Sequence, residues 1–423
     1  MNSSIAVIGA NFGDEGKGQL TDALVRRVQQ RSNRQVMVSR FNGGAQAGHT
    51  VVTKDARHVF GHIGSGTFAG ADTYLGSKFI VNLLALEGEL KKCPVDRPKI
   101  CFGARNRMTS IFDMSVNAIA EIMRTERHGS CGLGINETVT REEAGFVFNP
   151  KVLFRSDEDS IAQRLRVLRH VWVPIRLESL GLPNIKTLTA MAKDNQILSG
   201  PMSVMIENQF DFAGHARQLI EIGQSSLTAK VPISREVIFE GAQGLALDEN
   251  LGTFPHVTRS ITGLPFAIIT AAELAKTELT PLYITRPYLT RHGAGNLEHE
   301  GEEFCSERPS DVTNITNEWQ GTLRFAPLNL PMMKRLIKRD LMRAVDVASM
   351  YGVKLNSPLL AITCLDQIKG EITIVDLDGS KKRLQINDLP EYVCARLGIK
   401  LGALSHGPGA ENVEFSKLTY NEL

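Results

Sequence analysis

One glycine-rich segment near the start of the chain limits its possible folds more than any other feature. Residues 5–8 are four consecutive apolar residues and predict a buried strand that ends at Gly9. From residue 20 to residue 28, apolar residues recur with helical spacing. In the connecting turn, three further glycines let backbone N–H groups approach a ligand, and the helix N-terminus adds partial positive charge. The segment therefore predicts a strand–turn–helix phosphate site in an α/β protein.

The turn differs from the two common nucleotide-binding turns. A Walker A loop has a glycine five residues before its Gly-Lys pair, and this chain has Asn11 there. A dinucleotide-binding turn starts its helix within the glycines and requires no lysine, whereas Lys17 follows Gly16 here. Asp14 would repel a phosphate unless a metal ion or an abstractable proton compensates its charge. A solvated acidic turn is the alternative interpretation.

A second glycine-rich loop brings a histidine to the same edge of the predicted sheet. Residues 36–41 predict a strand, and the sequence Gly-Gly-Ala-Gln-Ala-Gly-His-Thr follows it at residues 43–50. A single histidine such as His49 is more often structural than functional. Together, however, Asp14 and His49 make an acid and a base on neighbouring loops.

Composition excludes several classes of protein. The chain has 423 residues, 42% hydrophobic and 22% charged, with a net charge of +2, so that no basic excess indicates a nucleic-acid surface. Its six cysteines form no Cys-x-x-Cys pair, which favours reduced thiols over structural zinc or a disulfide framework. No stretch approaches the roughly eighteen apolar residues of a membrane helix. We expect a soluble cytoplasmic protein that binds neither nucleic acid nor membrane.

Domain organisation shows no visible boundary. The chain contains no internal repeat and no low-complexity linker, so residues 1–423 are predicted to form a single domain. Residues 151–230 have helical periodicity with exposed charge, and we expect them to form a helical insertion. Helices are also predicted over residues 79–90 and 111–123, and a strand over residues 99–104.

The two loops carry a resemblance to a known enzyme family. Gly-Asp-Glu-Gly-Lys-Gly at residues 13–18, followed by Ala-Gly-His-Thr at residues 47–50, resembles the adenylosuccinate synthetases. These ligases join aspartate to a 6-oxopurine nucleotide. The resemblance implies an α/β fold with a large mixed, mainly parallel sheet flanked by helices, and a helical insertion.

The resemblance also implies a mechanism, because the carbonyl oxygen of a 6-oxopurine is a poor leaving group and must first be phosphorylated. Asp14 would take the N1 proton, while His49 and Lys17 would stabilise charge on the transferred phosphoryl group. Mg²⁺ would be held by Asp14 and the backbone carbonyl of Gly48. The amine of aspartate would then displace phosphate from C6.

Further short motifs resemble the family's nucleotide-binding segments. In the loop at residues 128–135, Ser130 is similar to a hydroxyl that grips the acceptor's 5′-phosphate. Arg141 is similar in place to an arginine donated across a homodimer, although a surface turn with an exposed arginine is the alternative. Glu-Gly-Ala-Gln-Gly at residues 240–244 matches a family turn whose glutamine lies beside purine and phosphate. The resemblance assigns nucleotide binding to Gly13, Glu15, Gly16, Gly18, Gln46, Gly48, Thr50, Ser130, Arg141, Gln243, Thr253, Cys364, Asp366, Ser405 and Gly407.

The expected aspartate site departs from the family pattern. Where the family has a loop rich in threonine and arginine, residues 311–324 contain a single arginine, Arg324. Bidentate arginine contacts are the natural way to hold a dicarboxylic acid. Arg324, with Thr313 and Thr316, is therefore the predicted aspartate-binding group, and a structural role for Arg324 is the alternative.

The donor-base site is similar to the family's in part. Residues 359–366 predict a buried strand that ends in Asp366, which resembles the family's guanine-binding aspartate, but Cys364 replaces the expected lysine. The turn that contains Ser405 and Gly407 resembles the one that closes this base pocket. GTP is the implied donor, and ATP stays open.

Three functions follow from these observations. The first is a ligase that uses IMP as the acceptor and gives adenylosuccinate. The second is a phage-type relative that aminates GMP or dGMP, because Gln46 replaces the usual asparagine. The third, of another class, is a nucleotide-binding regulator that has lost its aspartate chemistry.

Overall fold

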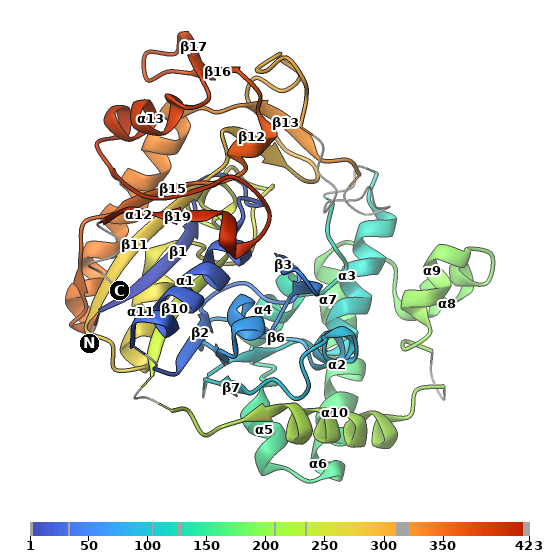
Figure 1. Cartoon of the computed structure of the whole chain (residues 1–423). Helices are drawn as coiled ribbons and strands as arrows, with labels where there is room; N and C mark the ends of the chain where they lie inside the picture. The colour runs from blue at the N-terminus through green and yellow to red at the C-terminus, as the bar shows by residue number, and fades with distance from the viewer. Residues whose placement is uncertain are drawn as a thin grey trace.

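The computed structural model describes residues 3–32, 34–103, 105–125, 129–206, 209–232, 235–309 and 321–417. Within these ranges the main sheet has 11 strands, whose neighbours are all parallel except β18 and β19. The predicted fold class, a mixed and mainly parallel sheet flanked by helices, is confirmed (Figure 1). In spatial order the strands are β19 (Val413–Phe415), β18 (Lys400–Ser405), β15 (Leu359–Ile362), β11 (Glu278–Thr285), β1 (Ser3–Gly9), β10 (Glu236–Gly244), β2 (Val36–Arg40), β5 (Asp72–Leu75), β7 (Ile100–Phe102) and β9 (Leu227–Thr228), with β14 (Lys354–Leu355) beside β11.

Small two-stranded sheets and helices surround the main sheet. The small sheets pair β3 (His49–Val52) with β4 (Arg57–Phe60), β6 (Ile80–Val81) with β8 (Arg107–Met108), β12 (Tyr288–Arg291) with β13 (Arg324–Pro327), and β16 (Glu371–Val375) with β17 (Lys381–Gln385). The helices are α1 (Lys17–Ser32), α2 (Leu83–Lys92), α3 (Ile111–Met123), α4 (Ile135–Glu143), α5 (Pro150–Arg155), α6 (Glu158–Val167), α7 (Val173–Ser179), α8 (Ile185–Ala192), α9 (Gln196–Met202), α10 (Phe212–Ser226), α11 (Leu264–Glu273), α12 (Leu330–Tyr351) and α13 (Leu389–Leu397).

The apolar run of β1 is buried on both faces of the sheet. Successive side chains of a strand point to opposite faces, so Ile5 and Val7 join a core cluster with the apolar residues of α1. Ala6 and Ile8 join the cluster that contains apolar residues of α11 and α12. This double burial is typical of a parallel sheet covered by helices on both faces.

The parallel order of the sheet collects the predicted motifs at one edge. Strands β1, β10, β11, β15 and β2 run in the same direction, so the segments that follow them leave the sheet on the same side. In open α/β sheets, ligands bind at the carboxyl ends of the strands. The fold therefore places the turn after β1, the loop after β2 and the end of β10 where a nucleotide could contact all three.

Two predicted helices show how local signals set an element's ends. The helix predicted over residues 111–123 coincides with α3, because Ser110 Oγ accepts from the Asp113 N–H (3.2 Å) and Asp113 Oδ2 accepts from the Ser110 N–H (2.8 Å). The prediction over residues 79–90 is wrong at its start. Ile80–Val81 form β6, and α2 begins only after Asn82, whose Oδ1 accepts from the Ala85 N–H (3.1 Å).

The described residues between 150 and 226 are helical from α5 to α10, with a π-helical turn (Leu168–Trp172) between α6 and α7. Their apolar side chains share one core cluster with α2, α3 and the strands β5 and β7, which includes Phe112, Trp172 and Leu188. In Figure 1, α8 and α9 lie at the right edge of the molecule, away from the main sheet. Their status as an insertion into a single domain stays a prediction.

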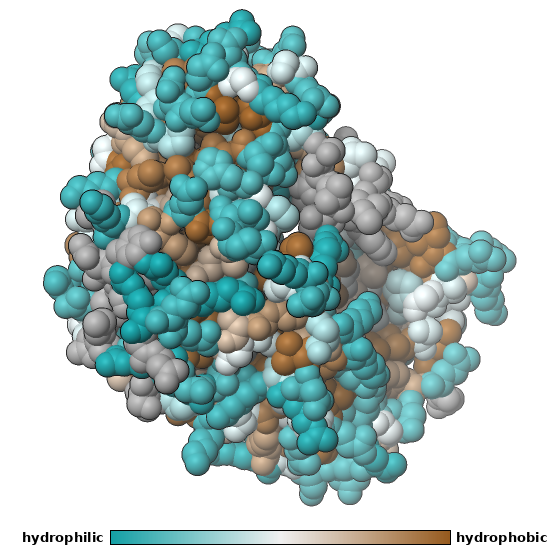
Figure 2. Space-filling view, in the orientation of Figure 1, coloured by the Kyte–Doolittle hydropathy of each residue, from teal (hydrophilic) through white to brown (hydrophobic). Residues whose placement is uncertain are grey.

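The surface is polar over most of the view in Figure 2, with hydrophobic residues exposed between hydrophilic ones. Large apolar side chains that are exposed include Ile197 on α9 and Met350 on α12. Among the described residues, no helix is both long enough and apolar enough to cross a lipid bilayer.

Candidate active site

The turn after β1 contains a buried acid that accepts a hydrogen bond from the turn's own backbone. Glu15 is buried, and its Oε1 accepts from the Asn11 N–H at 2.7 Å while its Oε2 lies 3.8 Å from Lys17 Nζ. Burial raises the pKa of Glu15 to about 7, although Lys17 opposes the shift, and burial also lowers the pKa of Lys17. The carboxyl of Glu15 and the amine of Lys17 therefore lie inside the turn, where a bound anion would favour the protonated form of each group.

Backbone geometry turns Asp14 outward. Gly13 and Gly16 have φ angles of 104° and 80°, and Asp14 itself has a φ of 56°, which few residues other than glycine adopt. A Cβ at Gly13 would lie 3.4 Å from Gln243 Cα, so the turn packs closely on the end of β10. The Asp14 side chain is 32% exposed, whereas those of Glu15 and Lys17 are 2–3% exposed. A carboxylate is thus offered to a ligand at the centre of the turn.

His49 pairs with a carboxylate that the sequence analysis did not single out. Its Nδ1 lies 2.6 Å from Glu240 Oε1, and Glu240 also accepts from the Ser65 N–H and hydroxyl. Burial, reinforced by Arg40, lowers the pKa of His49 to about 4. Burial opposes ionisation of Glu240, but His49 and Arg40 lower the pKa of its carboxyl to about 2. The pair is a neutral imidazole that donates to a buried carboxylate at neutral pH.

That arrangement leaves His49 Nε2 for a ligand. The atom is buried and has no hydrogen-bond partner among the described residues. A Cβ at Gly18 would lie 2.9 Å from His49 Cβ and 3.1 Å from the Thr50 carbonyl, so β3 packs directly against the first turn of α1. The second loop therefore contacts the segment that follows β1, as expected from its place in the sequence. We call the turn between β1 and α1, residues 10–16, the phosphate turn, after the ligand predicted for it.

The imidazole that contacts Asp14 is not that of His49. His292, which directly follows β12, has its Nε2 3.4 Å from Asp14 Oδ2. The sequence predicts an acid and a base, Asp14 and His49, on two neighbouring loops; in the structure each of the two has a different partner. His49 lies with Glu240, and Asp14 lies with His292.

Two amide side chains add unsatisfied polar atoms around the turn. Both Gln46 amide atoms and Gln243 Oε1 are buried without a hydrogen-bond partner in the described part of the chain. Gln243, near the end of β10, has a φ of 61°, which lies in the left-handed region instead of the extended region of a strand. Buried polar atoms normally have partners, so these are places where a polar ligand would compensate. A nucleotide-binding role for Gln46 and Gln243 stays a prediction.

The predicted donor-base segments approach the phosphate turn from β15 and β18. Thr363 Oγ1 donates to the Glu15 carbonyl at 2.9 Å, which ties the end of β15 to the turn. Cys364 adopts a left-handed conformation (φ 56°), and the exposed Asp366 follows in a 3₁₀ turn (Leu365–Gln367). Ser405 is buried at the end of β18, and its hydroxyl donates to the Gly407 carbonyl at 3.0 Å.

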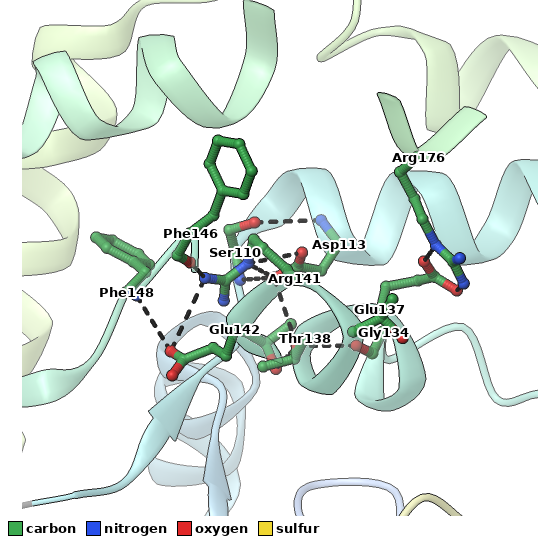
Figure 3. A network of polar contacts seen from close by, with 12 residues as sticks. Ser110, Asp113, Gly134, Glu137, Thr138, Arg141, Glu142, Phe146, Phe148 and Arg176 are labelled. Atoms are coloured by element: carbon green, nitrogen blue, oxygen red, sulfur yellow. Dashed lines mark hydrogen bonds and ion pairs between the residues drawn. The ribbon is translucent and has the colours of Figure 1, made fainter. Parts of the chain in front are cut away.

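Figure 3 shows Arg141 within a network of polar contacts that includes Asp113 and Thr138. Ser130 Oγ donates to Asn117 Oδ1 at 2.9 Å. Arg141 is fully buried: its Nε donates to both Asp113 oxygens at 3.0 and 3.1 Å, and its terminal nitrogens donate to the carbonyls of Met108 and Phe146. The alternative of an exposed surface arginine is wrong. In this conformation the guanidinium is occupied within its own chain, so an Arg141-mediated homodimer stays a prediction.

The predicted aspartate-binding residues fall into two groups. Thr313 and Thr316 lie outside the described residues. Arg324 donates to the carbonyls of Gly293 (2.7 Å) and Gly295 (2.7 and 2.9 Å) and pairs with Glu300 at 2.9 Å. Direct bidentate binding of aspartate by Arg324 would require these contacts to be exchanged.

Thr253 lies in an exposed segment after β10, next to the exposed Phe254. Its carbonyl accepts from the His256 N–H at 3.1 Å, and a contact between its hydroxyl and a phosphate stays a prediction.

Several residues that shape the site carried a weaker signal in the sequence. Glu240 begins the Glu-Gly-Ala-Gln-Gly motif that contains Gln243, and His292 begins the sequence His-Gly-Ala-Gly at residues 292–295. Gln19 directly follows Gly18, and Arg40 ends β2. In the sequence each of these is an ordinary polar residue beside a motif. Only their contacts with distant segments in the structure indicate a role.

Magnesium fits this site only as an ion that shares the nucleotide's phosphates. Among the described residues, no group of three or more His, Cys, Asp or Glu side chains could hold a metal ion by itself. Mg²⁺ is usually bound through one or two carboxylates together with waters and substrate phosphates. The partly exposed Asp14 carboxylate and the carbonyl of the exposed Gly48 suit that mode of binding.

Comparison with known proteins relates this chain to one enzyme family. The sequence model of the family described as adenylosuccinate synthetase matches residues 6–324. The adenylosuccinate synthetase of Francisella philomiragia is 26% identical, over 98% of this chain and 98% of its own. That of Lactobacillus acidophilus is 25% identical, over 90% of this chain and 82% of its own.

Two solved structures share the fold. Fully ligated adenylosuccinate synthetase from Plasmodium falciparum has a TM-score of 0.66 at 16% identity, covering 98% of this chain and 100% of that one. Cyanophage S-2L succinoaminodeoxyadenylate synthetase, bound to dGMP and to dATP as an energy donor, has a TM-score of 0.55 at 14% identity, covering 98% and 95%. Because the family model spans most of the sequence, the chain belongs to the adenylosuccinate synthetase family of ligases, which form a C–N bond.

Proposed function

We propose that this ligase joins L-aspartate to C6 of a 6-oxopurine nucleotide, with IMP as the favoured acceptor and GTP or ATP as the donor. One observation supports this most. The Asp14 carboxylate is partly exposed in a turn whose other charged side chains, Glu15 and Lys17, are buried against each other. A carboxylate in that place can accept a proton from a bound purine, whereas in an ordinary phosphate turn it would only repel the ligand.

In the first step Asp14 takes the proton from purine N1, and O6 attacks the γ-phosphorus of the donor. The O6–P bond forms while the bond from phosphorus to the β-phosphate oxygen breaks, which releases a nucleoside diphosphate. Lys17 and His49 Nε2 stabilise charge on the transferred group. An anionic phosphoryl oxygen favours the protonated form of His49, which Glu240 already supports from Nδ1. Mg²⁺, when held by Asp14 and the Gly48 carbonyl, supplies charge neutralisation at the phosphates.

In the second step the amine of aspartate attacks C6. The C–N bond forms, the C6–O6 bond breaks with phosphate as the leaving group, and the amine loses a proton. Arg324 serves the aspartate site by fixing the 293–295 turn, since its guanidinium donates to both Gly293 and Gly295 carbonyls. Thr313 and Thr316 complete the site in this proposal.

A second acceptor has support from one comparison. The cyanophage synthetase with the same fold was solved with dGMP and dATP. GMP or dGMP is therefore the alternative acceptor for this chain, with the same roles for Asp14 and Lys17. A nucleotide-binding regulator without ligase activity is the alternative of another class.

Release of phosphate, measured over a matrix of nucleotides, tests the proposal. IMP, GMP and dGMP are each combined with GTP, ATP or dATP, with and without L-aspartate. We expect aspartate-dependent phosphate release, fastest with IMP. Faster release with dGMP would move the assignment to the phage-type reaction. If the nucleotides bind but no pair of them gives aspartate-dependent release of phosphate, the alternative function of a nucleotide-binding regulator is favoured.

The role of Asp14 is tested by Asp14→Asn, which keeps the size of the side chain but removes the base. We expect turnover to be almost abolished while the nucleotides still bind, as measured by calorimetry. Retention of a tenth of the wild-type kcat would exclude Asp14 as the base.

A further inference from the structure

His292 touches the carboxylate that the proposed reaction depends on. Its Nε2 lies 3.4 Å from Asp14 Oδ2, and its side chain is 18% exposed. We propose that His292 is a positioning residue that holds the Asp14 carboxylate in the orientation needed to take a proton from the acceptor. The inference rests on the proposed function, which makes Asp14 the base.

The carboxylate needs such a restraint. Asp14 sits at a φ of 56° between two glycines with positive φ angles, in a turn that a mobile backbone could rearrange. Its side chain is 32% exposed, and among the described residues His292 is the one basic side chain with a nitrogen within 4 Å of the carboxylate. A base must lie within hydrogen-bond reach of the proton it removes, so loss of its orientation costs rate.

The turn that carries His292 is itself fixed. Arg324 donates to the carbonyls of Gly293 and Gly295, the residues that follow His292 in this turn. Arg291 donates to the Asn296 carbonyl at 2.7 Å and to the His256 carbonyl at 3.2 Å. The His292 imidazole therefore lies at the end of β12, in a turn whose backbone is held by hydrogen bonds from two arginines.

The segment that carries His292 also contacts the phosphate turn through Arg291. The Arg291 guanidinium lies 4.6 Å from the centroid of the Phe12 ring, two residues before Asp14. Consecutive residues of one segment, Arg291 and His292, thus contact Phe12 and Asp14 of the other. These two contacts hold the turn after β12 against the phosphate turn, so that the His292 imidazole stays beside the Asp14 carboxylate.

His49 cannot perform this task in the described conformation. Its Nδ1 is occupied by Glu240 at 2.6 Å, and its Nε2 is the atom assigned above to the phosphoryl group. The two imidazoles therefore have different roles in the proposal: His49 contacts the transferred phosphoryl group, and His292 orients the Asp14 carboxylate.

Substitutions at position 292 separate the two ring nitrogens. His292→Gln can place an amide N–H near the position of Nε2, whereas His292→Asn reaches only the position of Nδ1, which is buried without a hydrogen-bond partner among the described residues. We expect His292→Ala and His292→Asn to lower kcat by about 10- to 100-fold with KM values for both nucleotides changed less than about threefold. His292→Gln should retain most of the kcat.

A matched control uses a second histidine–carboxylate pair. His299 Nδ1 lies 3.1 Å from Glu302 Oε1, away from the phosphate turn, and its φ of 62° suits asparagine. His299→Asn should leave kcat unchanged. Thermal unfolding of every variant checks that the fold persists.

Three kinetic results would overturn the inference: a wild-type kcat for His292→Ala, a change confined to KM, or rescue by Asn and not by Gln. Crystal structures of the wild type, His292→Ala and His292→Gln give a readout that needs no turnover. We expect one Asp14 rotamer in the wild type and in the Gln variant, and a different or divided one in the Ala variant. An unchanged Asp14 in His292→Ala would also overturn it. A wild type without aspartate-dependent turnover would instead count against the proposed function.

Discussion

Gln19 and Ser405, 386 residues apart in the sequence, are joined by a hydrogen bond of 2.9 Å from Gln19 Nε2 to Ser405 Oγ. The same amide donates to the carbonyls of Gly407 (2.5 Å) and Gly409 (2.7 Å). Gln19 lies in the first turn of α1, directly after the phosphate turn. The turn that resembles the family's base-closing segment is therefore anchored to the helix that would receive the phosphates.

The first prediction concerns this anchor. Gln19→Ala removes the amide donor that ties α1 to Ser405, Gly407 and Gly409 of the 405–409 turn, at a cost of roughly 1.4 kcal/mol. We expect the KM for the donor nucleotide to rise about tenfold with a smaller change in kcat. Gln29→Ala, on the same helix and bonded to the Ala69 carbonyl at 2.7 Å, is the control and should leave the donor KM unchanged. Equal effects of the two variants would contradict a specific role for Gln19.

The second prediction tests whether Arg141 is structural. Arg141 and Asp113 form a buried ion pair, and Arg141→Met would leave the Asp113 carboxylate buried without its cation. We expect the free energy of unfolding to fall by about 3–5 kcal/mol in urea titrations. Adding Asp113→Asn should recover part of that loss, because the uncompensated charge is removed.

Kinetics of the same variants address the homodimer. If Arg141 works only within its own subunit, the folded fraction of Arg141→Met keeps the wild-type KM for the acceptor nucleotide. A large rise in that KM in the folded variant would favour the arginine donated across a dimer. The oligomeric state, measured by light scattering at several concentrations, completes the test.

The third prediction follows from the buried pair of His49 and Glu240. Burial lowers the pKa of His49 from 6.5 to about 4, so the unfolded chain gains a proton before the folded chain does as the pH falls. Stability from this group is complete above pH 6.5 and is lost as the pH falls towards 4, by about 3 kcal/mol in all. Glu240, whose pKa falls from 4.5 to about 2, adds further loss below pH 4.5.

The measurement is the difference in unfolding free energy between wild type and His49→Gln at pH 7, 6 and 5. We expect His49→Gln to be less sensitive to pH over this window. The same pH slope in both proteins would show that the ring titrates normally in the folded state.

The fourth prediction has the opposite sign. Burial raises the pKa of Asp340 from 3.8 to about 7, assisted by Asp248 and opposed by the Leu264 N–H and the Tyr283 hydroxyl. The folded state therefore binds a proton that the unfolded state releases, and stability from this group is lost as the pH rises from about 4 to about 7.

Asp340→Asn removes this titration. Between pH 4 and pH 8, its unfolding free energy should improve relative to wild type by up to about 4 kcal/mol. Asp346→Asn, on the exposed face of the same helix α12, provides the control. A constant difference between Asp340→Asn and wild type across this range would contradict the prediction.

Comparison of individual elements shows how far local sequence signals reach. The strand at residues 5–8, the turn after it and the helix from Lys17 follow from apolar spacing and glycines within about twenty-five residues. Helix α3 follows from its capping box and its amphipathic pattern. The helix predicted from residue 79 began too early, because pairing of β6 with β8, a contact between distant segments, overrode the local pattern.

The sequence alone determined the class of fold, the order of the motifs and the presence of Asp14 in a phosphate turn, because these depend on residue spacing along the chain. Only the tertiary structure decided which side chains meet: Glu240 with His49, His292 with Asp14, and Asp113 with Arg141. Arg141 and Asp113 are 28 positions apart in the sequence, and His49 and Glu240 are 191 positions apart. Their contacts arise from the order and direction of strands in the sheet and from close packing between loops, which no spacing within one segment encodes.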